Sequence, residues 1–214
     1  MPGIGSWEIQ SSPQVLIGVP HTGLVTMEWV ASFKSLQHPP AAISYSRGTP
    51  IDHCRNALID QMFGTNCEYI FFLDSDIVAP PDTILRLMNH HLPVVSAIYW
   101  IKHPTPLQKP HPALWRENAE KQAVPVIDHR PGELLEVDFV GCGALLVHRK
   151  VFERIEKPYF RWTVGFEKDG MSEDFTWCKK VRAAGFKIFC DTSLVCRHVS
   201  FMNVSDRGIE FSSV

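Results

Sequence analysis

The sequence predicts an α/β fold in which a mainly parallel central sheet is flanked by helices. First, short apolar segments alternate four times with amphipathic ones over residues 14–100. Second, the five residues Tyr69–Leu73 are apolar without alternation, which is typical of a strand covered on both faces. Third, 214 residues with 45% hydrophobic content can bury a sizeable core. We therefore expect residues 1–214 to form a single domain.

Local patterns predict the elements of the first hundred residues. Apolar runs bounded by turn residues predict strands at 14–20, 41–45, 69–73 and 93–100. Apolar residues at helical spacing predict helices at 25–36, 49–63 and 81–88. The second helix carries its own start signal, with Thr49 as N-cap and Pro50 in the first helical position.

The pattern changes after the fourth strand. Residues 101–133 are rich in Pro and His and show little periodicity, apart from a hairpin expected to turn at 118–120. Irregular stretches of this length are usually functional or mobile, so we expect a lid or an acceptor-side wall here. Beyond it, strands are expected at 137–140, 144–148, 186–190 and 193–196, with helices from 151 and from 172 to 184.

Composition argues against nucleic-acid-binding, membrane-spanning and secreted proteins. The formal net charge of −2 provides no strong electrostatic case for nucleic acid. No apolar run approaches the roughly 20 residues of a membrane helix, and the N-terminus does not resemble a signal peptide. The six cysteines show no Cys-x-x-Cys spacing and indicate free thiols. We expect a cytoplasmic protein, and its oligomeric state is open.

Two carboxylates, Asp74 and Asp76, directly follow the buried segment 69–73. Ligand crevices of parallel sheets lie just outside the carboxyl ends of the strands. If the chain stays extended there, both side chains leave on the same side. Two such oxygen donors fit a divalent cation that keeps some waters and also binds phosphate oxygens. The alternative is an acidic turn that precedes the helix near 80–82.

Five motifs together resemble a known family. In chain order they are Arg55–Leu58, Leu73–Ile77, Phe139–Gly143, Ser172–Asp174 and His198. They resemble, in that order, five features of GT-A-fold, family-2-like nucleotide-sugar glycosyltransferases: the Ala-Arg-Asn-type helix near the diphosphate, the Asp-x-Asp metal motif, the glycine-containing strand beside the donor sugar, the Glu-Asp pair and the late metal-binding histidine. The resemblance spans roughly residues 14–200. It implies a single Rossmann-like domain that moves a sugar from a UDP- or GDP-type donor to a hydroxyl acceptor, with inversion.

The resemblance also implies roles for individual residues. Mn²⁺ or Mg²⁺ would bind Asp76 directly and His198 through nitrogen, with Asp74 acting through water or the nucleotide ribose. Asp174 would be the general base and Glu173 would lie near the acceptor. The residues expected to contact the nucleotide or the donor sugar are Pro20, Thr22, Arg47, Arg55, Asp74, Ser75, Gly141 and Gly143.

Simpler alternatives remain for these residues. Glu173 and Asp174 would complement a helix dipole without any catalysis. His198 would serve equally as a strand-end histidine hydrogen-bonded to a neighbour, and both arginines as solvated surface groups. At the level of function, the alternatives are a retaining GT-A transferase, a nucleotidyltransferase and a non-catalytic sugar-nucleotide-binding module. The turn Gly18–Gly23 lacks the lysine that a nucleotidyltransferase would normally use there.

Overall fold

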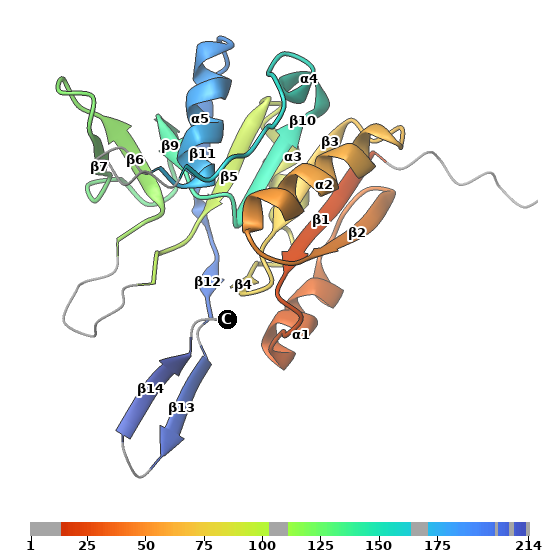
Figure 1. The fold of residues 1–214 in the computed structure, drawn as a ribbon, viewed down its shortest axis with the longest axis vertical. Helices are drawn as coiled ribbons and strands as arrows, with labels where there is room; N and C mark the ends of the chain where they lie inside the picture. Colours follow the sequence, from red (N-terminus) through yellow and green to blue (C-terminus); the bar gives the residue numbers. More distant parts are fainter. Residues whose placement is uncertain (1–13, 103–110, 164–170, 200, 206–207, 213–214) are drawn as a thin grey trace, which may run out of the picture.

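The computed structural model describes residues 14–102, 111–163, 171–199, 201–205 and 208–212. Its centre is a seven-stranded sheet in the order β2-β1-β3-β10-β5-β11-β8 (Figure 1). These strands are β1 (Val15–His21), β2 (Ala41–Arg47), β3 (Tyr69–Leu73), β5 (Val94–Ile98), β8 (Leu134–Val137), β10 (Ala144–His148) and β11 (Ile188–Val195). β1 pairs in parallel with β2 and β3, and β5 with β11, whereas β10 and β8 run antiparallel to their neighbours. The predicted mainly parallel sheet is confirmed.

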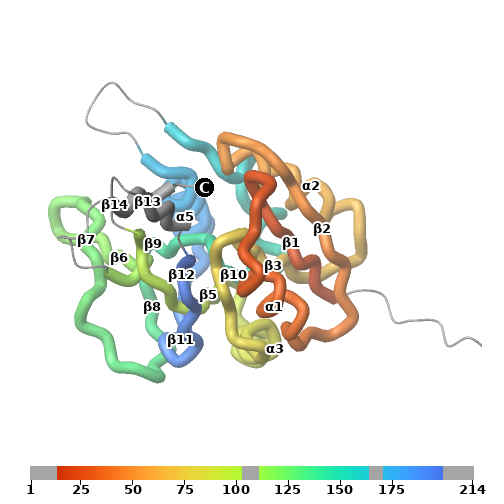
Figure 2. Tube along the Cα trace, turned by 90° about the horizontal axis from the view of Figure 1, so that it is seen from below, coloured from red at the N-terminus to blue at the C-terminus, as the bar shows by residue number. Residues whose placement is uncertain are grey.

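Helices cover both faces of the sheet. They are α1 (Met27–Ser35), α2 (Ile51–Phe63), α3 (Thr83–Asn89), α4 (Arg149–Phe152) and α5 (Glu173–Ala183). Seen along the sheet in Figure 2, α2 and α5 lie on one side and α1 and α3 on the other. The buried side chains accordingly form two apolar clusters, one on each side of the sheet.

β3 shows why its sequence is apolar at every position. Ile70 and Phe72 belong to the cluster beneath α2 and α5, whereas Phe71 and Leu73 belong to the cluster beneath α1 and α3. All four side chains are fully buried. Because side chains alternate between the faces of a strand, a strand covered on both faces must be apolar throughout.

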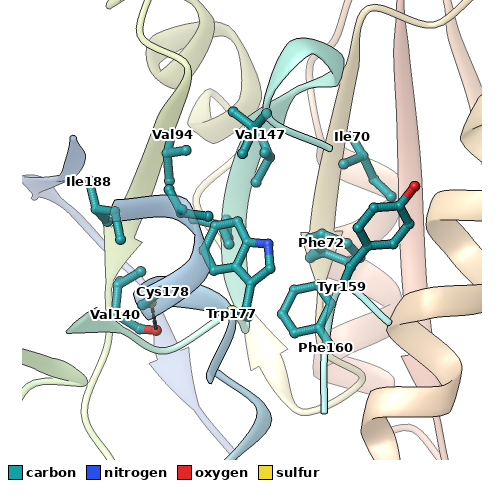
Figure 3. Close-up of a cluster of buried hydrophobic side chains, with 14 of the residues drawn as sticks. Ile70, Phe72, Val94, Val140, Val147, Tyr159, Phe160, Trp177, Cys178 and Ile188 are labelled. Atoms are coloured by element: carbon teal, nitrogen blue, oxygen red, sulfur yellow. Dashed lines mark hydrogen bonds between the residues drawn. The ribbon is translucent and has the colours of Figure 1, made fainter. Parts of the chain in front are cut away.

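Stacked aromatic rings anchor α5 beside the end of β3 (Figure 3). The Trp177 indole stacks on the Phe160 ring with centroids 5.3 Å apart, and Phe160 meets Phe72 edge-on at 5.7 Å. On the next residue of α5, the Cys178 thiol donates to the Val140 carbonyl at 3.7 Å. These contacts set where the first turn of α5 lies relative to the carboxyl end of β3.

Several predicted boundaries need correction. The N-cap of α2 is Pro50, without a side-chain hydrogen bond, so Thr49 does not cap this helix. The predicted strand at 193–196 is the end of β11, which continues through an irregularity between Asp191 and Val195. The predicted strand at 137–140 is divided, because β8 ends at Val137 in the main sheet and β9 (Phe139–Val140) belongs to another.

Smaller sheets surround the central one. β9 pairs with β6 (Leu114–Glu117), which forms the predicted hairpin with β7 (Ala123–Pro125). β4 (Ile77–Val78) pairs with β12 (Arg197–His198), and β13 (Phe201–Ser205) pairs with β14 (Gly208–Ser212). Of the irregular range 101–133, residues 103–110 lie outside the described part. None of the described helices is long and apolar enough to cross a membrane.

Candidate functional site

The chain turns immediately after the central strand β3. The Ile77 amide donates to the Asp74 carbonyl at 3.0 Å, and the Trp29 indole on α1 donates to the same oxygen at 2.9 Å. The backbone is therefore not extended between Asp74 and Asp76, and the two carboxylates face different partners. The condition under which both side chains would leave on the same side, an extended backbone, is not met, because the chain turns at this point.

Asp74 faces Arg55 on α2. The guanidinium donates to both carboxylate oxygens, with Nη1–Oδ1 at 3.0 Å and Nη2–Oδ2 at 3.2 Å. Such fork geometry is the strongest form of this ion pair. Burial raises the pKa of the Asp74 carboxyl, and the charge and hydrogen bonds of Arg55 oppose that rise.

Arg55 joins three carboxylates in the protein interior. It is 2% exposed, and it also approaches Glu173 at 3.6 Å and Asp174 at 3.7 Å. Burial disfavours the charged guanidinium, but Asp74, Asp174 and Glu173 together hold the pKa of Arg55 above its ordinary value. The sequence-based alternative of a solvated surface arginine is wrong, and the guanidinium faces carboxylates here.

The two acids occupy the first turn of α5. Glu173 is 4% exposed, and burial together with the neighbouring Asp174 raises the pKa of its carboxyl to about 8. Asp174 is more accessible, with 21% of its side chain exposed. Its Oδ2 accepts from the Cys142 amide at 3.4 Å, and among the described residues its buried Oδ1 has no hydrogen-bond donor. Glu173 thus favours its protonated form near neutral pH, whereas Asp174 has one oxygen without a hydrogen-bond donor in the described part of the chain.

Asp76 meets two nitrogen groups at a single oxygen. His198 Nε2 lies 3.2 Å from Asp76 Oδ2, and Lys102 Nζ lies 2.6 Å from it. Burial would raise the pKa of Asp76, but the hydrogen bonds and charges of His198 and Lys102 lower it to about 2. The pairing of β12 with β4 holds His198 there, and the Val199 amide donates to the Asp76 carbonyl at 2.8 Å.

His198 is oriented as a metal-binding histidine would be. Its Nδ1 lies 2.8 Å from the Trp100 carbonyl, which can only accept, so Nδ1 carries a proton and Nε2 points to Asp76. The described residues hold no group of three His, Cys, Asp or Glu side chains suited to a metal ion. Asp76 Oδ2 and His198 Nε2 are the pair that could hold a cation here, with its other ligands taken from water and phosphate oxygens. Asp74, which was expected to act through water or the nucleotide ribose, is paired with Arg55.

The glycine pair Gly141 and Gly143 makes room for Tyr99, which follows β5. A Cβ on Gly141 would collide with the Tyr99 hydroxyl, and one on Gly143 would lie 3.1 Å from both Tyr99 Cζ and Asp74 Oδ2. The Gly143 amide donates to the Tyr99 hydroxyl at 3.1 Å. Both glycines are buried, so in this structure they pack against the protein instead of lining open space.

Tyr99 and Lys102 were missed as site residues. Each lies on the segment that follows β5. Lys102 pairs with Asp76, and the Tyr99 hydroxyl accepts a hydrogen bond from the Gly143 amide. A tyrosine after an apolar strand has the same pattern as a core residue, and a single lysine has the pattern of a surface residue. The only available signal was their position after a strand that ends at the ligand-binding edge of the sheet.

The remaining predicted donor residues lie at the same edge. His21 and Arg47 are register partners at the ends of β1 and β2, which run parallel to β3. Thr22 and Arg47 are exposed, Ser75 is half-buried and Pro20 is buried.

A cavity of about 370 Å³ opens beside the first turn of α2. The segment after Pro158 closes it, because Asn56 donates to the Phe160 carbonyl at 2.8 Å and the Trp162 amide donates to Asp52 at 2.9 Å. The side chain of Trp162 lines this cavity and is 48% exposed. Thr176 of α5 donates to the Arg161 carbonyl at 2.7 Å, so the cavity lies close to the start of α5.

Comparison with solved structures identifies proteins with a similar fold. The sequence matches no family model and no curated protein. The crystal structure of A197 from STIV is similar over 94% of this chain and 95% of that one, with a TM-score of 0.61 and 20% identity. GalNAc-T7, crystallised with UDP, GalNAc and Mn²⁺, is similar over 88% of this chain and 44% of that one, with a TM-score of 0.53 and 9% identity. At these identities the likeness concerns the fold alone, and the chain has a GT-A-like α/β fold.

Proposed function

We propose that this chain is a metal-dependent glycosyltransferase that moves a sugar from a UDP- or GDP-type donor to a hydroxyl acceptor, with inversion. One observation carries the proposal: Asp76 and His198, 122 residues apart, meet at 3.2 Å beside the carboxyl end of β3. The GT-A-like fold supports it, and so does the solved neighbour that holds UDP, GalNAc and Mn²⁺. We further propose that residues 1–214 act as one domain.

In this function Asp76 and His198 hold Mn²⁺ or Mg²⁺, which supplies positive charge for the departing nucleotide diphosphate. Asp74 acts indirectly, since Arg55 holds its carboxylate. Arg55 is therefore a positioning residue that fixes the turn after β3. The nucleotide lies along the edge formed by the ends of β1, β2 and β3, where Pro20, Thr22, Arg47 and Ser75 are found.

Asp174 serves as the general base. The acceptor oxygen attacks the anomeric carbon, the bond from that carbon to the diphosphate oxygen breaks, and the acceptor proton passes to the Asp174 carboxylate. The partial exposure of the Asp174 side chain, which contrasts with the buried Glu173, supports this assignment. Glu173, whose carboxyl has a pKa of about 8, stays largely protonated at neutral pH and limits the negative charge around Asp174.

The acceptor enters beside α5. We place it in the cavity between α2 and residues 158–162, where the exposed face of Trp162 offers an apolar surface for a sugar ring or another acceptor. The range 101–133, whose hairpin does not line this cavity, is proposed as a lid or a wall on the acceptor side.

A thermal-shift panel tests the proposal. UDP, GDP and CDP are added with and without Mn²⁺, and ligand at 100 times its Kd should stabilise the protein by about 2.7 kcal/mol. Asp76→Ala should abolish the Mn²⁺-dependent part of this shift. Asp60→Ala is the matched control, because Asp60 also pairs with a lysine but lies on the surface. A folded Asp76→Ala protein with an undiminished Mn²⁺-dependent shift would remove the basis of the proposal.

A further inference from the structure

The carboxylate of Asp76 already has a cation bound to it. Lys102 Nζ lies 2.6 Å from Oδ2, closer than His198 Nε2 at 3.2 Å on the same oxygen. The side chains of Lys102 and Asp76 are 33% and 27% exposed, so the pair lies at the mouth of the site, not in the interior. The amino group thus occupies the accessible side of the proposed metal ligand.

The backbone brings Lys102 to this position. Trp100 forms a bridge with Pro112, and the Ile101 amide donates to the His111 carbonyl at 3.0 Å. The same Trp100 accepts from His198 through its carbonyl. One short, hydrogen-bonded segment therefore supplies the lysine and also orients the histidine at Asp76.

Charge and distance make the lysine and a metal ion competitors. A divalent cation bound to a carboxylate oxygen sits at about 2.1 Å, next to the position of the ammonium group. Two nitrogen groups already crowd the Oδ2 atom of Asp76, so a metal ion at this oxygen would meet the ammonium group directly. Two cations at one oxygen repel each other strongly in a partly buried site.

We propose that Lys102 is the built-in counter-cation of Asp76 and that a divalent cation binds by displacing it. The inference rests on the metal site of the proposed function. It has a consequence for substrate binding. The metal binds weakly by itself and tightly together with a nucleotide diphosphate. The diphosphate oxygens add ligands to the metal, and their negative charge neutralises the ammonium group of the released lysine. The flexible four-carbon stem of lysine allows this release without a backbone change.

The test measures Mn²⁺ affinity without nucleotide, by electron paramagnetic resonance of free Mn²⁺ in a titration of the full chain. Lys102→Met should bind Mn²⁺ about tenfold or more tightly than the parent protein, because the competing charge is gone. Lys102→Arg keeps that charge and should retain the weak affinity. Lys187→Met is the matched control, since Lys187 forms a comparable 2.8 Å pair with Glu136 on the surface and should leave Mn²⁺ binding unchanged.

Three results would overturn the inference. Equal Mn²⁺ affinity of the parent and Lys102→Met, with Asp76→Asn still lowering it, leaves the proposed metal site intact but removes the competition. Weaker nucleotide binding by Lys102→Met without metal, and no gain in Mn²⁺ affinity, makes Lys102 the resident cation instead. Absence of Mn²⁺ binding in every variant removes both the inference and the metal dependence of the proposed function. Far-UV circular dichroism confirms folding, with Lys102→Gln as a second neutral variant.

Discussion

The carboxyl group of Glu173 lies in the interior, between Arg55 and Asp174, and its pKa is raised from 4.5 to about 8, first by burial and then by Asp174. The folded protein therefore binds a proton that the unfolded chain has released in this range. By linkage, this group makes the free energy of unfolding fall as pH rises from 4.5 to about 8.

We predict that Glu173→Gln flattens this pH dependence. Urea unfolding of the parent protein and the variant at pH 5, 6.5 and 8 gives the comparison, and the stability of Glu173→Gln relative to the parent should improve as pH rises. Glu153→Gln, which alters an exposed acid on the surface, should run parallel to the parent. A Glu173→Gln curve that also runs parallel would mean that the carboxyl is ionised in the folded state.

The sequence predicted the placement of individual residues where that placement depends only on the neighbouring residues in the chain. Asp74 and Asp76 lie at the end of the buried strand, as expected, because a continuous apolar run marks a central strand. The partners of each carboxylate were not predictable. Arg55 reaches Asp74 from 19 residues away and Lys102 reaches Asp76 from 26 residues away. Such pairings depend on helix placement and on a turn, neither of which leaves a local pattern.

At the scale of elements, the end of β5 and the segment joining β9 to β10 are packed too closely for any side chain at Gly141. An alanine Cβ there would overlap the Tyr99 hydroxyl and lie 2.9 Å from Cζ. We predict that Gly141→Ala destabilises the protein by roughly 1–3 kcal/mol, the usual cost of overpacking. Tyr99→Phe removes the overlapping oxygen, so the double variant should be more stable than the sum of the single changes implies.

A double-mutant cycle by urea unfolding measures this coupling. Additive effects of Gly141→Ala and Tyr99→Phe would show that the two elements relax apart. Mn²⁺ affinity is a second readout, because Tyr99 also meets the His198 ring edge-on at 5.4 Å. A shift of Tyr99 should therefore weaken metal binding as well as stability.

Elements with strong apolar patterns were predicted well, whereas their boundaries and partners were not. β3 and α5 are close to their expected ranges, since each buries a continuous face. Residues 137–140 were predicted as one strand because Val137, Phe139 and Val140 are apolar, yet β8 and β9 join different sheets. The difference lies in which strands pair over long sequence distances, and the local pattern does not encode this.

At the scale of the whole molecule, the proposed site residues come from segments that lie far apart in the sequence. The pairing of β12 with β4 brings His198 to Asp76, and the separate helix α5 supplies Asp174. Arg55 links α5 to the carboxyl end of β3, because it contacts both Asp74 and Asp174. In the proposed function, Asp76 and His198 hold the metal and the separate residue Asp174 is the base, so the attacking hydroxyl and the departing diphosphate are served by different groups.

We therefore predict a single displacement that inverts the anomeric centre, with Asp174 as its base. Asp174→Asn keeps the size of the side chain and removes its basicity, so turnover should fall by roughly 10²–10⁴ while donor affinity stays within a few-fold. Asp76→Ala should reduce both turnover and donor affinity, because Asp76 holds the metal as well. The NMR coupling constant of the product's anomeric proton reports the configuration. A retained linkage, or near-normal turnover of Asp174→Asn, would leave Asp174 as an acid that only complements the dipole of α5.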